Sequence, residues 1–187
     1  MELTRLRKAT ESQHRKVERD LDLLRASFGR DQYLVLLRRF YGFHQAWEPK
    51  VEARLESELP GFFAPRRKLH NIEADLRYLG AGTQDLVRVP KCEKLPSMES
   101  VGLALGSMYV IEGSSLGGRI LARHFGERLG MLPDAGCKFF AGYSERTSQM
   151  WSDFAEIMAN RPAAEDDDML EAAVSTFEVV GEWLGTK

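Results

Sequence analysis

The 187-residue sequence predicts an all-α protein that forms a single domain over residues 1–187. Apolar residues recur at steps of three and four along almost the whole chain, which is the spacing of one face of an α-helix. No segment alternates convincingly between polar and apolar residues, and no internal repeat is present. A chain of this length buries about 70 % of the surface that its unfolded form exposes, so one hydrophobic core is expected.

Six longer helical segments are expected, at about residues 3–24, 31–55, 66–79, 98–129, 144–159 and 165–184. Gly29 closes the first, Asp31 is expected to cap the second, and Pro49 is expected to kink it. Residues 81–97, which contain two prolines, are expected to form a loop on the surface. The helix over 98–129 is expected to be interrupted around its glycines.

The net charge argues against a nucleic-acid-binding protein, and the cysteine content argues against a protein held together by disulfides. The net charge of −2 leaves no broad basic field for nucleic-acid phosphates. Cys92 and Cys137 lie far apart and form no CxxC motif, as expected for reduced thiols in the cytoplasm. The N-terminus is charged from residue 2 and has no apolar signal segment. The weakly charged run 101–118 contains Glu112 and five glycines, which favours a buried helix over a membrane span.

One histidine, His14, lies on the apolar face of the first predicted helix, in the segment TESQHRKVE (residues 10–18). Alone, a histidine there is more often a core residue than a ligand. Glu18 follows one helical turn later, where a carboxylate accepts the Nδ1 proton and leaves Nε2 free for a metal ion, or pairs with an arginine. Arg7 lies two turns before His14, where a guanidinium either holds a ligand carboxylate or faces solvent.

A second segment, EGSSLGG (residues 112–118), contains three glycines. Gly113 and Gly117 share a helix face, although each glycine costs a helix about 1 kcal/mol relative to alanine. Close approach of another helix is one explanation, and close approach of a flat ligand is the other. Ser114 and Ser115 either bind water on such a ligand or cap carbonyls at a kink. A histidine nitrogen facing a helix without side chains suits a planar iron cofactor, which points to haem.

The other histidines yield weaker hypotheses. His44 and His70 are expected to be structural and without a carboxylate partner, and His124 to be an exposed residue near a helix end. A histidine phosphotransfer module is a competing function, but the apolar neighbours of His14 argue against it. A di-iron bundle is rejected, because Glu11 and His14 form an ExxH pair with no second copy.

Taken together, the sequence resembles the biliverdin-producing haem oxygenases, particularly the bacterial type, over most of the chain. Residues 6–18 are similar to the family's proximal segment, residues 69–80 to a structural stretch, and residues 108–118 (MYVIEGSSLGG) to the bacterial distal-helix motif. The resemblance implies a helical bundle that holds haem between a proximal N-terminal helix and a kinked, glycine-rich distal helix. Phe139, Phe140 and Phe177 fall where family members carry core aromatic residues.

The resemblance also implies roles for individual residues. The axial iron ligand is His14, which Glu18 orients. The other implied haem-binding residues are Arg7 and Tyr109, at the propionates, with Gly113, Gly117 and Phe177. The residues implied to take part in the chemistry on the distal helix are Gly113, Ser114, Ser115 and Gly117. Ser114 stands where animal-type members carry an aspartate, and Arg146 is a candidate for a basic residue of the penultimate helix.

The implied reaction is the opening of haem by O2 to biliverdin, carbon monoxide and ferrous iron, with haem as both substrate and cofactor. No GxGxxG or flavin-type segment is present, so electrons are expected from a separate ferredoxin or reductase. A bilin-binding photoreceptor or a biliverdin reductase is a further expected partner, and neither nucleic acid nor membrane is expected. The alternative is a haem-binding or sensor protein of the same fold without catalysis, which the serine at position 114 keeps open.

Overall fold

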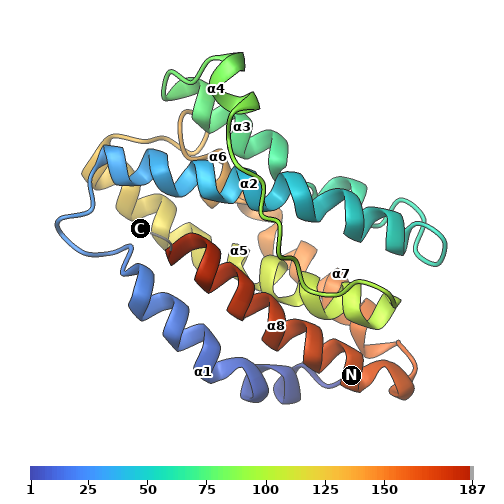
Figure 1. The fold of residues 1–187 in the computed structure, drawn as a ribbon. Coiled ribbons are helices and arrows are strands. Elements are labelled where there is room, and N and C mark those ends of the chain that lie inside the picture. Colours follow the sequence, from blue (N-terminus) through green and yellow to red (C-terminus); the bar gives the residue numbers. More distant parts are fainter. Residues whose placement is uncertain (186–187) are drawn as a thin grey trace.

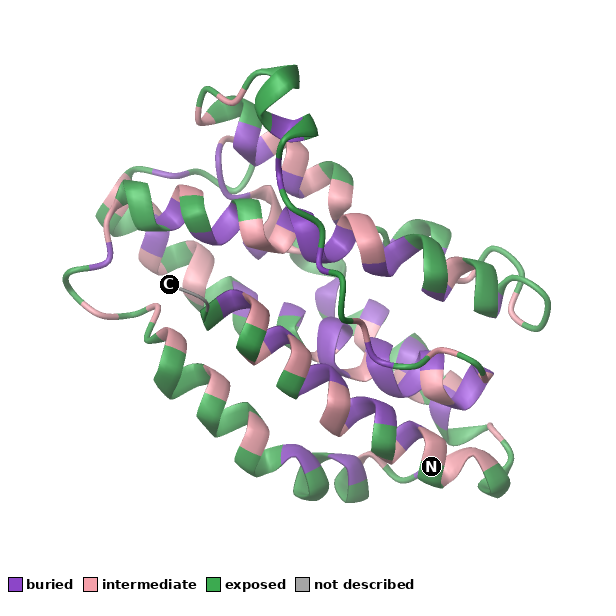
Figure 2. Cartoon of the chain, viewed as in Figure 1, coloured by how far each residue is buried: buried purple, intermediate pink, exposed green. Residues whose placement is uncertain are grey.

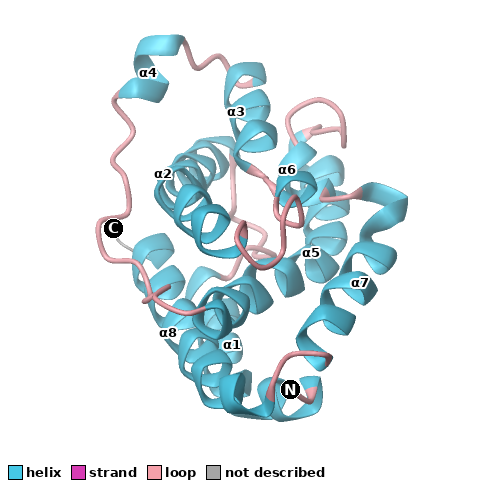
Figure 3. Ribbon diagram, turned by 90° about the vertical axis from the view of Figure 1, so that its right-hand side faces the viewer, coloured by secondary structure: helices cyan, strands magenta, loops and turns pink. Residues whose placement is uncertain are grey.

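The computed structural model describes residues 1–185, which form a bundle of helices with no named strand (Figure 1). The helices are α1 (Leu3–Leu21), α2 (Arg30–Leu55), α3 (Leu69–Tyr78), α4 (Thr83–Val87), α5 (Val101–Leu129), α6 (Lys138–Ala141), α7 (Thr147–Ala159) and α8 (Asp166–Gly185). Short 3-10 turns precede α3, α7 and α8. The predicted all-α class is confirmed, and Figure 3 shows the bundle from the side.

Helix α5 is the centre of the bundle. It packs against α8 most extensively, and also against α2, α6 and α7. Helix α1 lies at the periphery and packs mainly against α8 (Figures 1 and 3). Figure 2 shows the contrast in burial, because α5 is largely buried over its first half whereas Leu6 and Thr10 are the only fully buried residues of α1. The outer helix is therefore held to the bundle by a narrow stripe of contacts.

The expected interruption of the long helix is wrong, because α5 runs without a break through residues 113–118. The helix begins where the Ser100 hydroxyl accepts the Leu103 N–H at 3.1 Å, and it ends at Leu129, because the next residue, Gly130, has a left-handed φ of 70°. Packing of α5 against its neighbours outweighs the low helix propensity of its glycines. The glycine-rich segment is thus presented as regular helix.

Other element boundaries differ from expectation for local reasons. Helix α1 ends at Leu21 because Asp22 adopts a left-handed φ of 39°. Helix α2 begins one residue before Asp31, with Gly29 at the N-cap position and its N–H donated to the Gln32 side chain at 2.7 Å. The expected loop over 81–97 contains α4, a short helix that its local sequence did not suggest.

Both cysteines are buried, and neither is in a disulfide. Burial raises the pKa of the Cys137 thiol to about 11 and also raises that of Cys92. Within residues 1–185, no helix has the length and apolar character needed to cross a membrane.

Candidate functional site

The His14 side chain lies at the edge of the contact between α1 and α8. Its ring meets the Phe177 ring edge-on, with centroids 5.6 Å apart. Its Nδ1 lies 3.4 Å from a carboxylate oxygen of Glu18, and 55 % of the His14 side chain is exposed. A residue that is more than half exposed is not a core histidine, so the structural explanation considered for His14 does not apply.

Helices α1 and α5 approach each other at Tyr109, which is half-buried. Burial raises the pKa of the Tyr109 phenol, and the nearby Thr10 hydroxyl and the positive charge of Arg7 oppose that rise. The Tyr109 ring also lies 5.8 Å from the Trp151 ring of α7, centroid to centroid. The structure therefore brings Arg7 and Tyr109 together, about two turns of α1 before His14.

The glycines of α5 fall into two groups according to what a Cβ atom would meet. At Gly106 a Cβ would lie 2.2 Å from the Met169 carbonyl oxygen, and at Gly118 it would lie 2.7 Å from the Phe140 carbonyl oxygen. At Gly113 it would be in ordinary contact with the Trp151 ring at 3.7 Å, and at Gly117 it would meet no atom within 4 Å. Packing between helices explains the first group of glycines and leaves the second unexplained.

Gly113 and Gly117 lie on one face of α5, called here the bare face. Two apolar residues extend this face. Leu116 is 43 % exposed and Ile120 is 64 % exposed, and each is within about one turn of Gly117. Together with Gly113, they make a surface of aliphatic side chains and bare backbone. Neither residue was predicted from the sequence, although two aliphatic residues at i and i+4 beside Gly117 are a visible signal.

The two serines of the segment are directed differently from the glycines. The Ser114 hydroxyl donates to the Ile111 carbonyl of its own helix at 2.7 Å. Ser115 is buried, and a Cβ added to Gly142 would lie 3.7 Å from its Cβ. Ser115 is about 200° around the helix from Gly113, so its side chain lies on the opposite face. From the opposite face, the Ser115 side chain does not reach the glycine face, where it was expected to bind water on a ligand.

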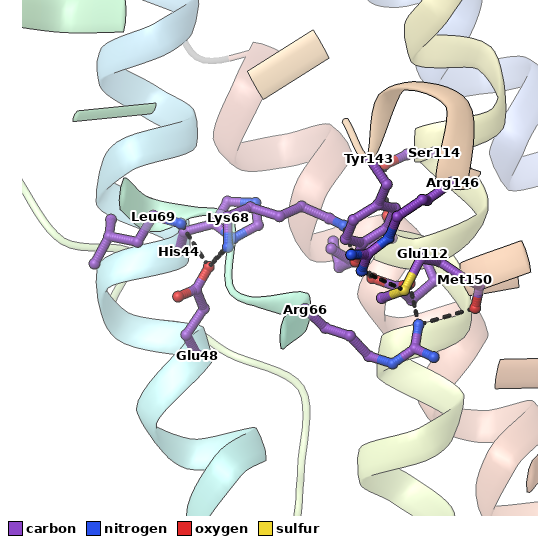
Figure 4. A network of polar contacts seen from close by, with 11 residues as sticks. His44, Glu48, Arg66, Lys68, Leu69, Glu112, Ser114, Tyr143, Arg146 and Met150 are labelled. Carbon is purple, nitrogen blue, oxygen red and sulfur yellow. Dashed lines mark hydrogen bonds and ion pairs between the residues drawn. The ribbon is translucent and has the colours of Figure 1, made fainter. Parts of the chain in front are cut away.

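A buried ionic cluster lies beside the glycine segment and was not predicted (Figure 4). Glu112 accepts hydrogen bonds from Arg66 at 2.7 Å, from the Lys68 ammonium at 2.9 Å and from the Tyr143 hydroxyl at 2.7 Å. Arg66 also donates to the Met150 carbonyl of α7 at 3.0 Å. Burial lowers the pKa of Lys68, and the charge of Glu112 opposes this effect. The partners are too far apart in sequence for a local pattern to reveal them.

The expectation that His44 lacks a carboxylate partner is wrong. Its Nδ1 lies 2.9 Å from a carboxylate oxygen of Glu48, one turn later on α2, and both side chains are almost fully buried. The same oxygen accepts the backbone N–H groups of Lys68 and Leu69 at 2.7 and 2.8 Å, at the start of α3 (Figure 4). Burial lowers the pKa of His44 despite the neighbouring carboxylate.

Arg146, the candidate basic residue of the penultimate helix, is exposed, and its guanidinium lies 3.5 Å from the Met150 sulfur. In the described part of the chain, no three or more histidine, cysteine, aspartate or glutamate residues are gathered as a metal-binding cluster.

Two sequence comparisons both relate this chain to haem oxygenases. The family model described as Heme oxygenase matches residues 2–186. A curated protein named "Heme oxygenase", from Xanthomonas campestris pv. campestris (strain 8004), is 28 % identical over 149 residues, which are 79 % of this chain and 85 % of that protein.

Solved structures show the same fold. The NO- and CO-bound heme oxygenase from Neisseria meningitidis has a TM-score of 0.77 and 22 % identity, over 98 % of this chain and 92 % of that one. Heme oxygenase 2 from Chlamydomonas reinhardtii, solved without heme, has a TM-score of 0.76 and 20 % identity, over 97 % and 95 % of the two chains. Because the family model spans nearly the whole sequence, the chain belongs to the haem oxygenase family of haem-degrading oxidoreductases.

Proposed function

We propose that this haem oxygenase holds its substrate haem between α1 and α5, with the His14 imidazole as the iron ligand. The observation that carries the proposal is the pair Gly113 and Gly117, whose missing side chains are not required by any contact between helices. A flat ligand is the remaining explanation for a helix face stripped to its backbone. His14 on α1 supplies the one exposed imidazole that also touches α8, the helix packed against both α1 and α5.

The residues on α1 fit a haem ligand and its support. A carboxylate next to Nδ1 selects the tautomer whose Nε2 lone pair is available to iron, and Glu18 lies at that nitrogen. Arg7 and Tyr109 form a polar end to the site, with a positive charge and a hydroxyl suited to the haem propionates. We assign Phe177, Leu116 and Ile120 to the apolar surface of the macrocycle, from which they exclude water.

Bound haem would supply the iron that activates O2; with electrons from an external donor, its ring would be oxidised to biliverdin and carbon monoxide, and its iron would be released in the ferrous state. The bare backbone at Gly113 and Gly117 would let α5 lie close to the flat surface of bound haem. Because the sequence contains no nucleotide- or flavin-binding motif, a ferredoxin or a reductase supplies the electrons. A biliverdin reductase or a bilin-binding photoreceptor is a suitable acceptor of the product.

The test is to add haem to the purified protein and record the visible spectrum before and after ascorbate or a ferredoxin system is supplied in air. We expect a Soret band that decays into a broad red-absorbing bilin spectrum, with release of carbon monoxide. A Soret band that persists under reduction would leave a haem-binding protein without turnover. That second function is favoured by one observation, the bonding of Ser114 to its own helix where a distal carboxylate is absent.

Two glycine variants test whether the missing side chain at position 117 makes room for haem. Gly117→Leu is expected to leave the haem-free protein folded, because no protein atom lies within 4 Å of the new Cβ, and to weaken or misdirect ring opening. Gly118→Leu is the matched control, since its side chain would collide with the Phe140 backbone and destabilise the fold. Normal turnover by Gly117→Leu, with the same biliverdin isomer, would place haem elsewhere.

A further inference from the structure

We propose that Glu112 is a positioning residue of the haem site, whose buried carboxylate fixes the bare face of α5 relative to His14. The inference rests on the proposed location of haem between α1 and α5. Glu112 does not contact the substrate in this proposal. It acts through Gly113, the residue that follows it.

The carboxylate of Glu112 joins α5 to three other parts of the bundle. Arg66 belongs to the 3-10 turn before α3, Lys68 precedes the first residue of α3, and Tyr143 follows α6. Through Arg66 the cluster also reaches the Met150 carbonyl of α7. Figure 4 shows these side chains converging on Glu112 from separate elements. The Glu112 side chain therefore fixes one point along α5 relative to α3, α6 and α7.

The position of Glu112 along α5 matters because few side chains of residues 113–118 hold the helix in place. Gly113 and Gly117 have no side chains on the site face, and their backbone makes no close contact that demands a glycine. On the opposite side, Ser115 is buried beside Gly142 and Gly118 packs on the Phe140 carbonyl. Contacts on the far side of α5 thus set the position of the bare face, with Glu112 before it and Gly118 after it.

The composition of the cluster indicates a positional role more than a stabilising one. Buried ion pairs often add little net stability, because removing the charges from water opposes their attraction. Arg66 is almost fully buried, and its Nε atom has no hydrogen-bond partner in the described chain. The guanidinium also lies 4.4 Å from the Phe62 ring centroid. Such a cluster gives α5 one defined placement, since any shift leaves buried charges unpaired.

The experiment compares Glu112→Gln with Tyr143→Phe and with a remote control, Arg161→Met. Arg161 pairs with Glu58 and Glu165 outside the haem site, so its loss lowers stability without acting on the glycine segment. Three quantities are measured: the melting temperature of the haem-free protein, amide hydrogen exchange at residues 113–118, and the haem dissociation rate with the biliverdin isomer ratio.

We expect Glu112→Gln to accelerate exchange at residues 113–118 by about tenfold beyond any change at the centre of α8, where exchange reports global opening. Haem dissociation is expected to accelerate by about tenfold and the isomer ratio to shift, with smaller changes of the same kind in Tyr143→Phe. If Glu112→Gln does not fold, Tyr143→Phe decides, because it removes one hydrogen bond and no charge.

The proposal is overturned if the Glu112 and Tyr143 variants lose only as much local protection and haem affinity as Arg161→Met at an equal loss of melting temperature. It is also overturned if the isomer ratio is unchanged in both variants. Failure of the wild-type protein to bind haem would instead reject the proposed function. The exchange measurement on haem-free protein separates these cases, because it reports on α5 alone.

Discussion

The molecule contains two histidine–glutamate pairs with identical spacing, and they lie in contrasting environments. His44 and Glu48 on α2 are 1 % and 6 % exposed, and their atoms lie 2.9 Å apart. His14 and Glu18 on α1 are 55 % and 66 % exposed, and their atoms lie 3.4 Å apart. The buried pair also binds the first N–H groups of α3, so its polar atoms are engaged within the fold. The comparison teaches that spacing alone does not identify a ligand, because pairs with the same spacing differ in whether the imidazole is accessible.

The largest expected effect is on the exposed pair. His14→Ala should reduce haem affinity by about a thousandfold, roughly 4 kcal/mol, because the iron loses its only protein ligand under the proposed function. The melting temperature of the haem-free protein should stay nearly constant, since the side chain is more than half exposed. Haem titration and thermal unfolding measure the two quantities. Stoichiometric haem degradation by this variant without added imidazole would contradict the assignment.

The buried pair should respond in the opposite way. His44→Leu is expected to lower the free energy of unfolding by about 3 kcal/mol, because Glu48 loses its partner inside the protein. Haem affinity, measured at a temperature where the variant is folded, should remain within about threefold of wild type. Chemical denaturation and haem titration check these expectations. A loss of affinity as large as that of His14→Ala would erase the distinction between the two pairs.

Removing the second member of the exposed pair should have an intermediate effect. Glu18→Gln is expected to weaken haem binding by about tenfold, since groups that orient a ligating histidine typically contribute 10- to 100-fold. The side chain is exposed, so stability should change by less than about 0.5 kcal/mol. The spectrum of the ferric complex should shift as imidazole basicity falls. Binding and spectrum identical to wild type would show that Glu18 only faces solvent.

The pH dependence of stability sharpens the comparison further. Burial lowers the pKa of His44 below its usual 6.5, so the unfolded chain takes up this proton before the folded one does. Stability should therefore fall as pH drops below about 6.5, by up to about 1.4 kcal/mol per pH unit. The loss deepens further below pH 4.5, because the pKa of Glu48 is also lowered in the fold. In His44→Leu the slope between pH 6.5 and 5 should flatten, and an unchanged slope would exclude His44 as its source.

The smallest expected effect returns to the bare face of α5. Gly117→Ala should stabilise the haem-free protein by about 0.5–1 kcal/mol, because alanine is the better helix former and the new methyl group meets no atom. The same change at Gly106 should destabilise, since the Met169 carbonyl occupies that space. Denaturation of the two haem-free variants measures both signs. Destabilisation by Gly117→Ala would mean that packing, and not a ligand, requires this glycine.

The sequence was sufficient for the fold class and for the location of most helices, because their apolar periodicity is strong and local. It also identified the family-like segments around His14 and Gly113, which are short and continuous. The Glu112 cluster was not foreseeable, since Arg66 and Glu112 are 46 residues apart and meet only through packing. The i+4 spacing of His44 and Glu48 is visible in the sequence, but the spacing alone does not show that the two side chains are buried together.

The glycines show where local information ends. The sequence places Gly113 and Gly117 on one helix face, but it does not show what packs against each glycine. The neighbouring backbone in three dimensions makes Gly118, alone of the three, a packing requirement. For the same reason, the expected interruption of α5 was wrong. A helix propensity summed over 113–118 contains no term for the elements that pack around it.

The exposed aliphatic pair Leu116 and Ile120 has a consequence for the life cycle of the enzyme. Under the proposed function, the haem that covers these two side chains is degraded in each catalytic cycle, so Leu116 and Ile120 face water again after every turnover. The protein must therefore remain folded in a haem-free state that recurs in every catalytic cycle. In the haem-free state these exposed aliphatic side chains favour self-association at high concentration, and under the proposed function newly bound haem covers them.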